Sequence, residues 1–192
     1  MQIKEKEYTD MKYYKVRLAF RYAPDRLYRI FWVISNMDCS TLAYYIQRMF
    51  YATFEHLYMF ETKKLGRLIC SDDEPIDISD KYMDTVVIDE LAGENIIFTY
   101  DFGDNWEFVG KVYKRTKDFP DDSPEIILIE GAGKGIWEDN VWSYFQYLSG
   151  ELSPDLTKEE DPECMSMPWN FEIEKLKDVD APLDIAKEQK RL

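Results

Sequence analysis

The sequence predicts a single α+β domain with a mixed or antiparallel sheet, and three observations support this fold class. Residues 12–35 have the pattern of a β-hairpin, residues 36–54 that of an amphipathic helix, and several strand-sized segments follow. A chain of 192 residues can form one substantial core but is short for two independent domains. The order strand–strand–helix–strand–strand is β-grasp-like. We therefore expect residues 1–192 to form one domain, with its core at 12–180 and helices toward its C-terminus.

The first three elements have the clearest periodicity. Residues 11–20, MKYYKVRLAF, alternate large apolar side chains with charged or small ones, as in a half-buried strand, and LYRIFWVIS at 27–35 forms the second strand. Between them, a proline followed by an aspartate predicts a turn. Asp38 or Ser40 is the expected N-cap of the helix. Its apolar residues recur at helical spacing: Leu42, Tyr45, Ile46, Met49 and Phe50.

The rest of the chain alternates strands and loops before it ends in helices. Five further strands are predicted, at residues 56–62, 66–71, 95–102, 106–114 and 125–131. The acidic segment 84–93 is expected to contain a short strand or a helical turn, and 114–124 a loop.

Two helices are expected near the C-terminus. The first spans 139–150, with Asp139 as N-cap and Gly150 at its end. The second spans 171–179, after an irregular stretch at 151–170 that contains three prolines. Residues 181–192 are expected to be a frayed tail.

Composition narrows the class of protein. No apolar run approaches the roughly 20 residues of a membrane-spanning helix, and the N-terminus does not resemble a secretory signal. The three cysteines, Cys39, Cys70 and Cys164, form no CxxC pair, which favours free thiols over a disulfide framework or a zinc knuckle. These features predict a cytoplasmic protein without a membrane partner.

The net charge of −14 is concentrated in one segment. Residues 71–107 contain twelve acidic side chains and a single base, Lys81, which gives a local charge of −11. Such a segment repels phosphate backbones, so direct binding of nucleic acid is not expected. It is typical of a solvated surface, and it would also attract cations or a basic protein partner.

The stretch FTYDFGDNW, residues 98–106, allows two interpretations. In the first, it is a tight turn between two strands, closed by aromatic side chains and formed by Gly103, Asp104 and Asn105. This explains every residue type except Asp101. In the second, Asp101 and Asp104, with Glu107, bind a hard cation such as Mg²⁺ or Ca²⁺, which take oxygen ligands. The spacing does not fit an EF-hand loop.

The single histidine and a glycine-rich segment are the other two candidates for a catalytic motif. His56 is the only histidine, which excludes a two-histidine metal site within one chain, and its position at the start of an aromatic strand favours a packed, hydrogen-bonded role. The segment EGAGKGIWED at 130–139 lacks the glycine spacing of a phosphate-binding loop. It is interpreted instead as a glycine loop that leads through Trp137, Glu138 and Asp139 into the next helix.

Several segments together resemble the plasmid pRiA4b ORF-3-like family. Residues 26–61 resemble the opening of that family, with Arg29 before the helix and His56 at the following strand. Its most distinctive motif resembles YDFGDNW, formed here by Tyr100, Asp101, Phe102, Gly103, Asp104 and Trp106. The similarity spans roughly residues 12–180. It implies an α+β fold without an established activity, in a family that includes passenger proteins of insertion elements.

One segment departs from the family pattern. Members usually have paired prolines followed by acidic residues and paired glycines where this chain has GAGKGIWEDNVW. Gly131, Glu138 and Asp139 remain, while Ile136 and Trp137 replace the prolines. Any function that depends on the proline-containing form of this loop is therefore in doubt.

Three functions from different classes remain open. The leading one is a non-catalytic cytoplasmic interaction module, associated with mobile genetic elements, that binds a basic protein partner. The second is a hydrolase that uses Mg²⁺, Mn²⁺ or Ca²⁺ bound by Asp101, Asp104, Glu138 and Asp139. The third is an acidic mimic of DNA. The hydrolase requires the two carboxylate pairs to meet within one coordination sphere, so its test is geometric.

Overall fold

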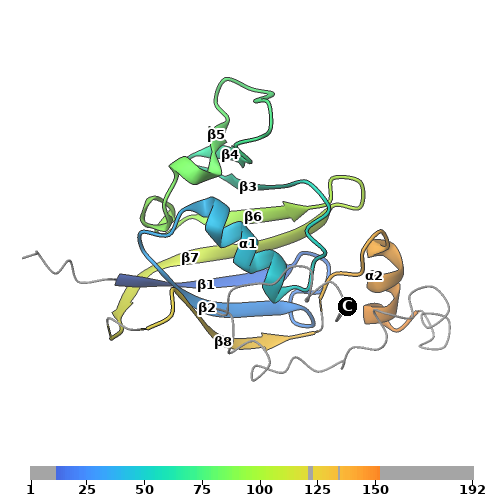
Figure 1. Ribbon diagram of the computed structural model, residues 1–192. Helices are drawn as coiled ribbons and strands as arrows, with labels where there is room; N and C mark the ends of the chain where they lie inside the picture. The colour runs from blue at the N-terminus through green and yellow to red at the C-terminus, as the bar shows by residue number, and fades with distance from the viewer. Residues whose placement is uncertain (1–11, 121–122, 134, 152–192) are drawn as a thin grey trace, which may run out of the picture.

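The chain forms one eight-stranded sheet with two helices, a mixed α+β single domain dominated by the sheet (Figure 1). The computed structural model describes residues 12–120, 123–133 and 135–151. The strand order is β5-β4-β3-β6-β7-β1-β2-β8. Neighbouring strands are antiparallel except for β4 and β5. The strands are β1 (Lys12–Phe20), β2 (Tyr28–Ile34), β3 (Tyr58–Thr62), β4 (Gly66–Ile69), β5 (Lys81–Tyr82), β6 (Asn95–Tyr100), β7 (Trp106–Asp118) and β8 (Ile126–Ala132).

Helix α1 (Cys39–Met49) lies across one face of the sheet, where its apolar side packs (Figure 1). Asp38 is its N-cap, one of the two predicted, and its carboxylate accepts hydrogen bonds from the backbone N–H and the hydroxyl of Thr41, both at 2.8 Å. Beyond the helix, Phe50 contacts Phe108 of β7, with ring centroids 4.1 Å apart. Large rings dominate the core, as the aromatic composition predicts.

Arg29 is fully buried and joins three elements. Its Nε donates to the carbonyl of Met49 at the end of α1, at 2.9 Å, while one terminal nitrogen donates to the carbonyls of Tyr28 and Ala132 at 2.8 and 2.7 Å. The guanidinium also lies over the ring of Phe50, 4.7 Å from its centroid. Arg29 therefore has a structural role, linking β2, α1 and β8.

The structure corrects several predicted boundaries. Strand β7 continues to Asp118, through much of the predicted 114–124 loop, because the long β1 supplies backbone partners as far as Lys12. The segment 84–93 forms helical turns, the second of its two predicted alternatives: η1 (Met83–Thr85) and η2 (Ile88–Leu91). The two-residue β5 was not predicted. A β-grasp-like order is not confirmed, since β1 lies between two antiparallel neighbours, β2 and β7.

Helix α2 (Val141–Ser149) begins one residue later than predicted. Its N-cap is Asn140, whose side chain accepts a hydrogen bond from the backbone N–H of Ser143, and Asp139 is not the cap. Gly150 ends the helix in the left-handed conformation, as expected. The predicted irregular stretch at 151–170, apart from residue 151, the helix at 171–179 and the tail at 181–192 lie outside the described residues. Among those described, no helix combines the length and apolar character needed to cross a membrane.

Candidate metal site around His56

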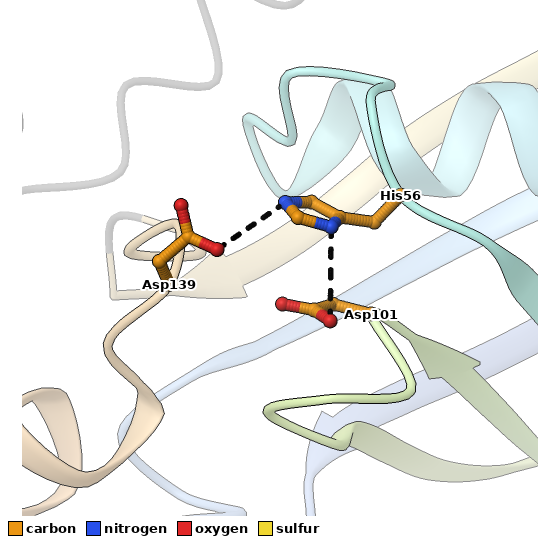
Figure 2. A group of neighbouring side chains, drawn as sticks. All are labelled: His56, Asp101 and Asp139. Atoms are coloured by element: carbon orange, nitrogen blue, oxygen red, sulfur yellow. Dashed lines mark ion pairs between the residues drawn. The ribbon is translucent and has the colours of Figure 1, made fainter.

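Three loops meet beside the start of α2 and bring together residues that are distant in the sequence. They are the segment after α1, the β6–β7 turn and the segment just before α2. Figure 2 shows the side chains of His56, Asp101 and Asp139, one from each loop, pointing toward one another. Asp101 and Asp139, one from each of the two carboxylate pairs considered from sequence, therefore lie close together, with the only histidine of the sequence between them.

The distances around the imidazole are uniform. Nδ1 of His56 lies 3.7 Å from Oδ1 of Asp101, and Nε2 lies 3.6 Å from Oδ1 of Asp139 and 3.5 Å from Oε2 of Glu138. His56, Asp101 and Asp139 each offer one ligand atom within 4.8 Å of the other two. These contacts are longer than N–H···O hydrogen bonds, which are about 2.7–3.2 Å. Two ligands that share an ion at about 2.1 Å are themselves roughly 3–4 Å apart. Asp101 and Asp139 face different ring nitrogens, only one of which can bind a given ion, and the three ligand atoms as a set lie within the wider limit of 4.8 Å.

Asp101 is held in place by the turn that follows it. It is 7% exposed and adopts a positive φ of 57°, which is uncommon for a residue other than glycine. Its Oδ1 accepts hydrogen bonds from the backbone N–H groups of Gly103 and Asp104, at 2.9 and 3.4 Å. These bonds explain the aspartate that the aromatic-turn interpretation did not, and they aim its carboxylate at His56.

In the β6–β7 turn, the glycine is not the residue with the left-handed backbone conformation. Asp101 and Asn105 have positive φ, whereas Gly103 does not. A Cβ on Gly103 would lie 3.2 Å from Oδ1 of Asp101, so a residue without a side chain gives that carboxylate room. Phe102 is partly exposed, while Tyr100 and Trp106 are buried beneath the turn.

Asp104 does not point toward the imidazole. Its Oδ2 accepts a hydrogen bond from the backbone N–H of Val141, the first residue of α2, at 3.0 Å. This contact satisfies one of the donors that a helix leaves free at its N-terminus. Glu107 also lies apart from the group, paired with Arg21 at 2.9 Å. Of the acidic residues considered from sequence, Asp101, Glu138 and Asp139 surround His56.

Glu138 has its own fixed environment. Its Oε1 accepts hydrogen bonds from the backbone N–H of Thr53 at 2.7 Å and from the hydroxyl of Tyr100 at 3.2 Å. Burial raises the pKa of the Glu138 carboxyl above its ordinary value, although the hydrogen bonds of Thr53 oppose this shift. Burial likewise raises the pKa of Tyr100 to about 12. Tyr100 therefore stays protonated and serves as a donor to the carboxylate.

The glycine loop delivers Glu138 and Asp139 to the site. Gly135 passes so close to the end of α1 that a Cβ would lie 2.3 Å from the carbonyl oxygen of Phe50. That same carbonyl accepts a hydrogen bond from the N–H of Ile136 at 2.8 Å. The glycine is thus required for close backbone approach, and the loop carries the next residues into place as the sequence predicted.

Sequence reasoning treated His56 as a packed residue and missed its position at the centre of the group. One signal was present: the single histidine lies in a segment that resembles a family motif. The direction of the side chain depends on the loop before β3, where Tyr51 and Phe54 have φ values of 56° and 67°. Such values in bulky residues cannot be predicted from periodicity.

The donor set indicates which ions the site suits. One imidazole nitrogen and two carboxylate oxygens are typical ligands of Mn²⁺, Fe²⁺, Co²⁺ and Zn²⁺, whereas Mg²⁺ and Ca²⁺ favour oxygen ligands alone. Three protein ligands leave positions open for water or substrate. The side chain of Asp139 is 80% exposed, so the group is accessible from solvent.

Comparisons with known proteins support the fold and the family. The family model described as plasmid pRiA4b ORF-3-like protein matches residues 12–178. The crystal structure of the protein of unknown function MM3350 from Methanosarcina mazei Go1 is similar, with a TM-score of 0.70 and 20% sequence identity, over 87% of this chain and 98% of that one. At this identity the likeness shows the fold. No curated protein matches the chain significantly.

Proposed function

This chain belongs to the plasmid pRiA4b ORF-3-like family, and we propose that its matched region holds a divalent transition-metal ion and uses it for hydrolysis. The ligands are His56, Asp101 and Asp139, all within residues 12–178. Family membership alone assigns no activity, so the proposal depends on the site.

One observation carries the proposal. Side chains from three separate loops converge so that their ligand atoms lie within 4.8 Å of one another, without hydrogen bonding directly to one another. The ion would neutralise the two carboxylates that face the imidazole. It would also polarise a bound water and lower its pKa, the usual metal contribution to hydrolysis.

Glu138 is the proposed proton acceptor. It lies 3.5 Å from Nε2 of His56 and is oriented by Thr53 and Tyr100, so its carboxylate is held beside the proposed ligands, where it could accept a proton from water. A carboxylate whose pKa is raised by burial is a stronger base than an exposed one. A phosphoester is the proposed substrate class, since a bound cation can neutralise its anionic oxygens.

The experiment is a hydrolysis assay with bis(p-nitrophenyl) phosphate on metal-free protein and on protein supplied with Mn²⁺ or Zn²⁺. We expect activity only with the ion, and a loss of about 100-fold or more in Glu138→Gln, in line with the contribution of a general base. Glu55→Gln is the matched control, because Glu55 is an exposed neighbour of His56 outside the group. Equal activity in Glu138→Gln and wild type would refute the role of Glu138, and inactivity of the metal-supplied wild type would count against hydrolysis of this class.

A second proposal concerns partners. The acidic segment 71–107 is largely at the surface and suits a basic cytoplasmic protein, while it disfavours nucleic acid. An interaction of this kind, in a protein associated with mobile elements, is compatible with a metal site. Mimicry of DNA receives less support, because several of the carboxylates are used within the chain: Asp80 pairs with Arg67, Asp89 accepts from Tyr14, Asp104 accepts from Val141 and Glu107 pairs with Arg21.

A further inference from the structure

We infer that the loop between β4 and β5, residues 71–80, is a docking element that inserts Ile76 and Ile78 into an apolar pocket of a basic protein partner. Figure 1 shows this loop projecting from the edge of the sheet, beyond β4 and β5. A partner can therefore approach it without displacing a strand. The inference rests on the proposed basic partner of the acidic segment and not on the metal site.

The two isoleucines are the most exposed large apolar side chains in the described part of the chain. Ile76 is 87% exposed, and Ile78, at 105%, is as accessible as in an extended peptide. Single exposed apolar residues are common, but two almost fully exposed branched side chains within three residues of one loop are not accounted for by the core. Burial of such side chains in a pocket is a main source of affinity at protein interfaces.

The loop is ordered by its own polar contacts. Oδ2 of Asp80 accepts hydrogen bonds from the backbone N–H groups of Ile76 and Asp77, both at 3.0 Å. The same carboxylate pairs with the guanidinium of Arg67 through two hydrogen bonds of 2.9 Å. Asp77 in turn accepts from the N–H and hydroxyl of Ser79, at 2.8 and 2.7 Å. A loop that is already ordered loses less conformational entropy on binding, which favours recognition.

The charge of the loop identifies the partner. Residues 71–80 contain five acidic side chains and no base, and the nearby Arg67 is already paired with Asp80. The acidic residues are Asp72, Asp73, Glu74, Asp77 and Asp80. The pocket that receives the isoleucines should therefore have a rim of Lys and Arg. Nucleic acid would be repelled, and a symmetric contact with a second copy would set two such loops against each other.

The experiment places a photo-crosslinking amino acid at position 78 of the full chain in cells of the source organism, with position 113 as the control, since Tyr113 is also exposed. We expect one basic protein to crosslink from position 78 and not from 113. That protein, purified, should bind the wild-type chain with an affinity that falls as salt rises. The affinity should fall at least 10-fold in the Ile76→Ser, Ile78→Ser double variant and remain unchanged in Ile129→Ser, an exposed isoleucine elsewhere.

Four results would overturn the inference. They are the absence of any product specific to position 78, a crosslink to a second copy of this chain, a crosslink to an acidic protein, and full affinity in the double variant. Circular dichroism of the double variant should match the wild type, because neither isoleucine packs in the core.

Discussion

The carboxylate of Asp104 accepts a hydrogen bond from the backbone N–H of Val141, at 3.0 Å, and so ties the β6–β7 turn to the first residue of α2. The same turn presents Asp101 to His56, while the segment just before α2 presents Glu138 and Asp139. Asp104 therefore fixes the distance between the two carboxylate groups. The family motif YDFGDNW supplies Asp101, a proposed ligand, and also the contact of Asp104 with α2.

Asp104 should act as a positioning residue. Replacing it in Asp104→Ala leaves the N–H of Val141 without its acceptor, and we expect a destabilisation of about 1 kcal/mol together with weaker metal binding. Asp104→Asn keeps a side-chain oxygen and should retain most of both. Thermal unfolding and metal titration of the two variants check this. If Asp104→Asn abolished metal binding while the fold remained intact, Asp104 would itself be a ligand.

Glu138 should destabilise the metal-free fold at neutral pH. Because burial raises its pKa in the folded protein, the protonated carboxyl favours folding, and this contribution is lost as the pH rises through the folded-state pKa. The variant Glu138→Gln should therefore melt at a higher temperature than wild type at about pH 7.5 in EDTA. The difference should shrink as the pH falls toward about 4, near the ordinary carboxyl pKa. A lower melting temperature for the variant at pH 7.5 would contradict this.

Gly135 should tolerate no side chain. The Cβ of an alanine at position 135 would lie 2.3 Å from the carbonyl oxygen of Phe50. Gly135→Ala must therefore displace either the backbone at the end of α1 or the loop itself. We expect a cost of about 1–3 kcal/mol in denaturant unfolding, as for other overpacked sites, and weaker metal binding. Gly150→Asn is the control, since nothing lies within 4 Å of that position and asparagine tolerates its left-handed backbone. Equal stability of Gly135→Ala and wild type would show that the loop adapts.

Local patterns predicted most of the described fold. Alternation identified β1 and β2, helical spacing identified α1 with Asp38 as its cap, and turn chemistry located the β6–β7 turn. The strand order was not predictable in this way, because pairing of β1 with β7 joins residues about a hundred positions apart. The length of β7 was underestimated for the same reason, since its distal part depends on β1.

Part of the residue group around His56 could be considered from sequence. Asp101, Asp104, Glu138 and Asp139 were candidates because hard cations take oxygen ligands, and three of the four lie beside His56. The role of His56 and the turning of Asp104 toward α2 depend on how three loops pack. Backbone conformations such as the positive φ of Asp101 and Asp139 decide where these side chains point, and residue type alone does not specify them.

The metal site at His56 is tested by a calorimetric titration of Mn²⁺ and Zn²⁺ into the wild type, His56→Ala and the control Glu55→Gln. We expect one ion per chain in the wild type and in Glu55→Gln. Binding should be at least 100-fold weaker in His56→Ala, because a protein ligand is lost from a three-ligand site. The far-ultraviolet circular dichroism spectrum of His56→Ala should match that of the wild type. Equal binding in His56→Ala and wild type, or no saturable binding in the wild type, would contradict the proposed metal site.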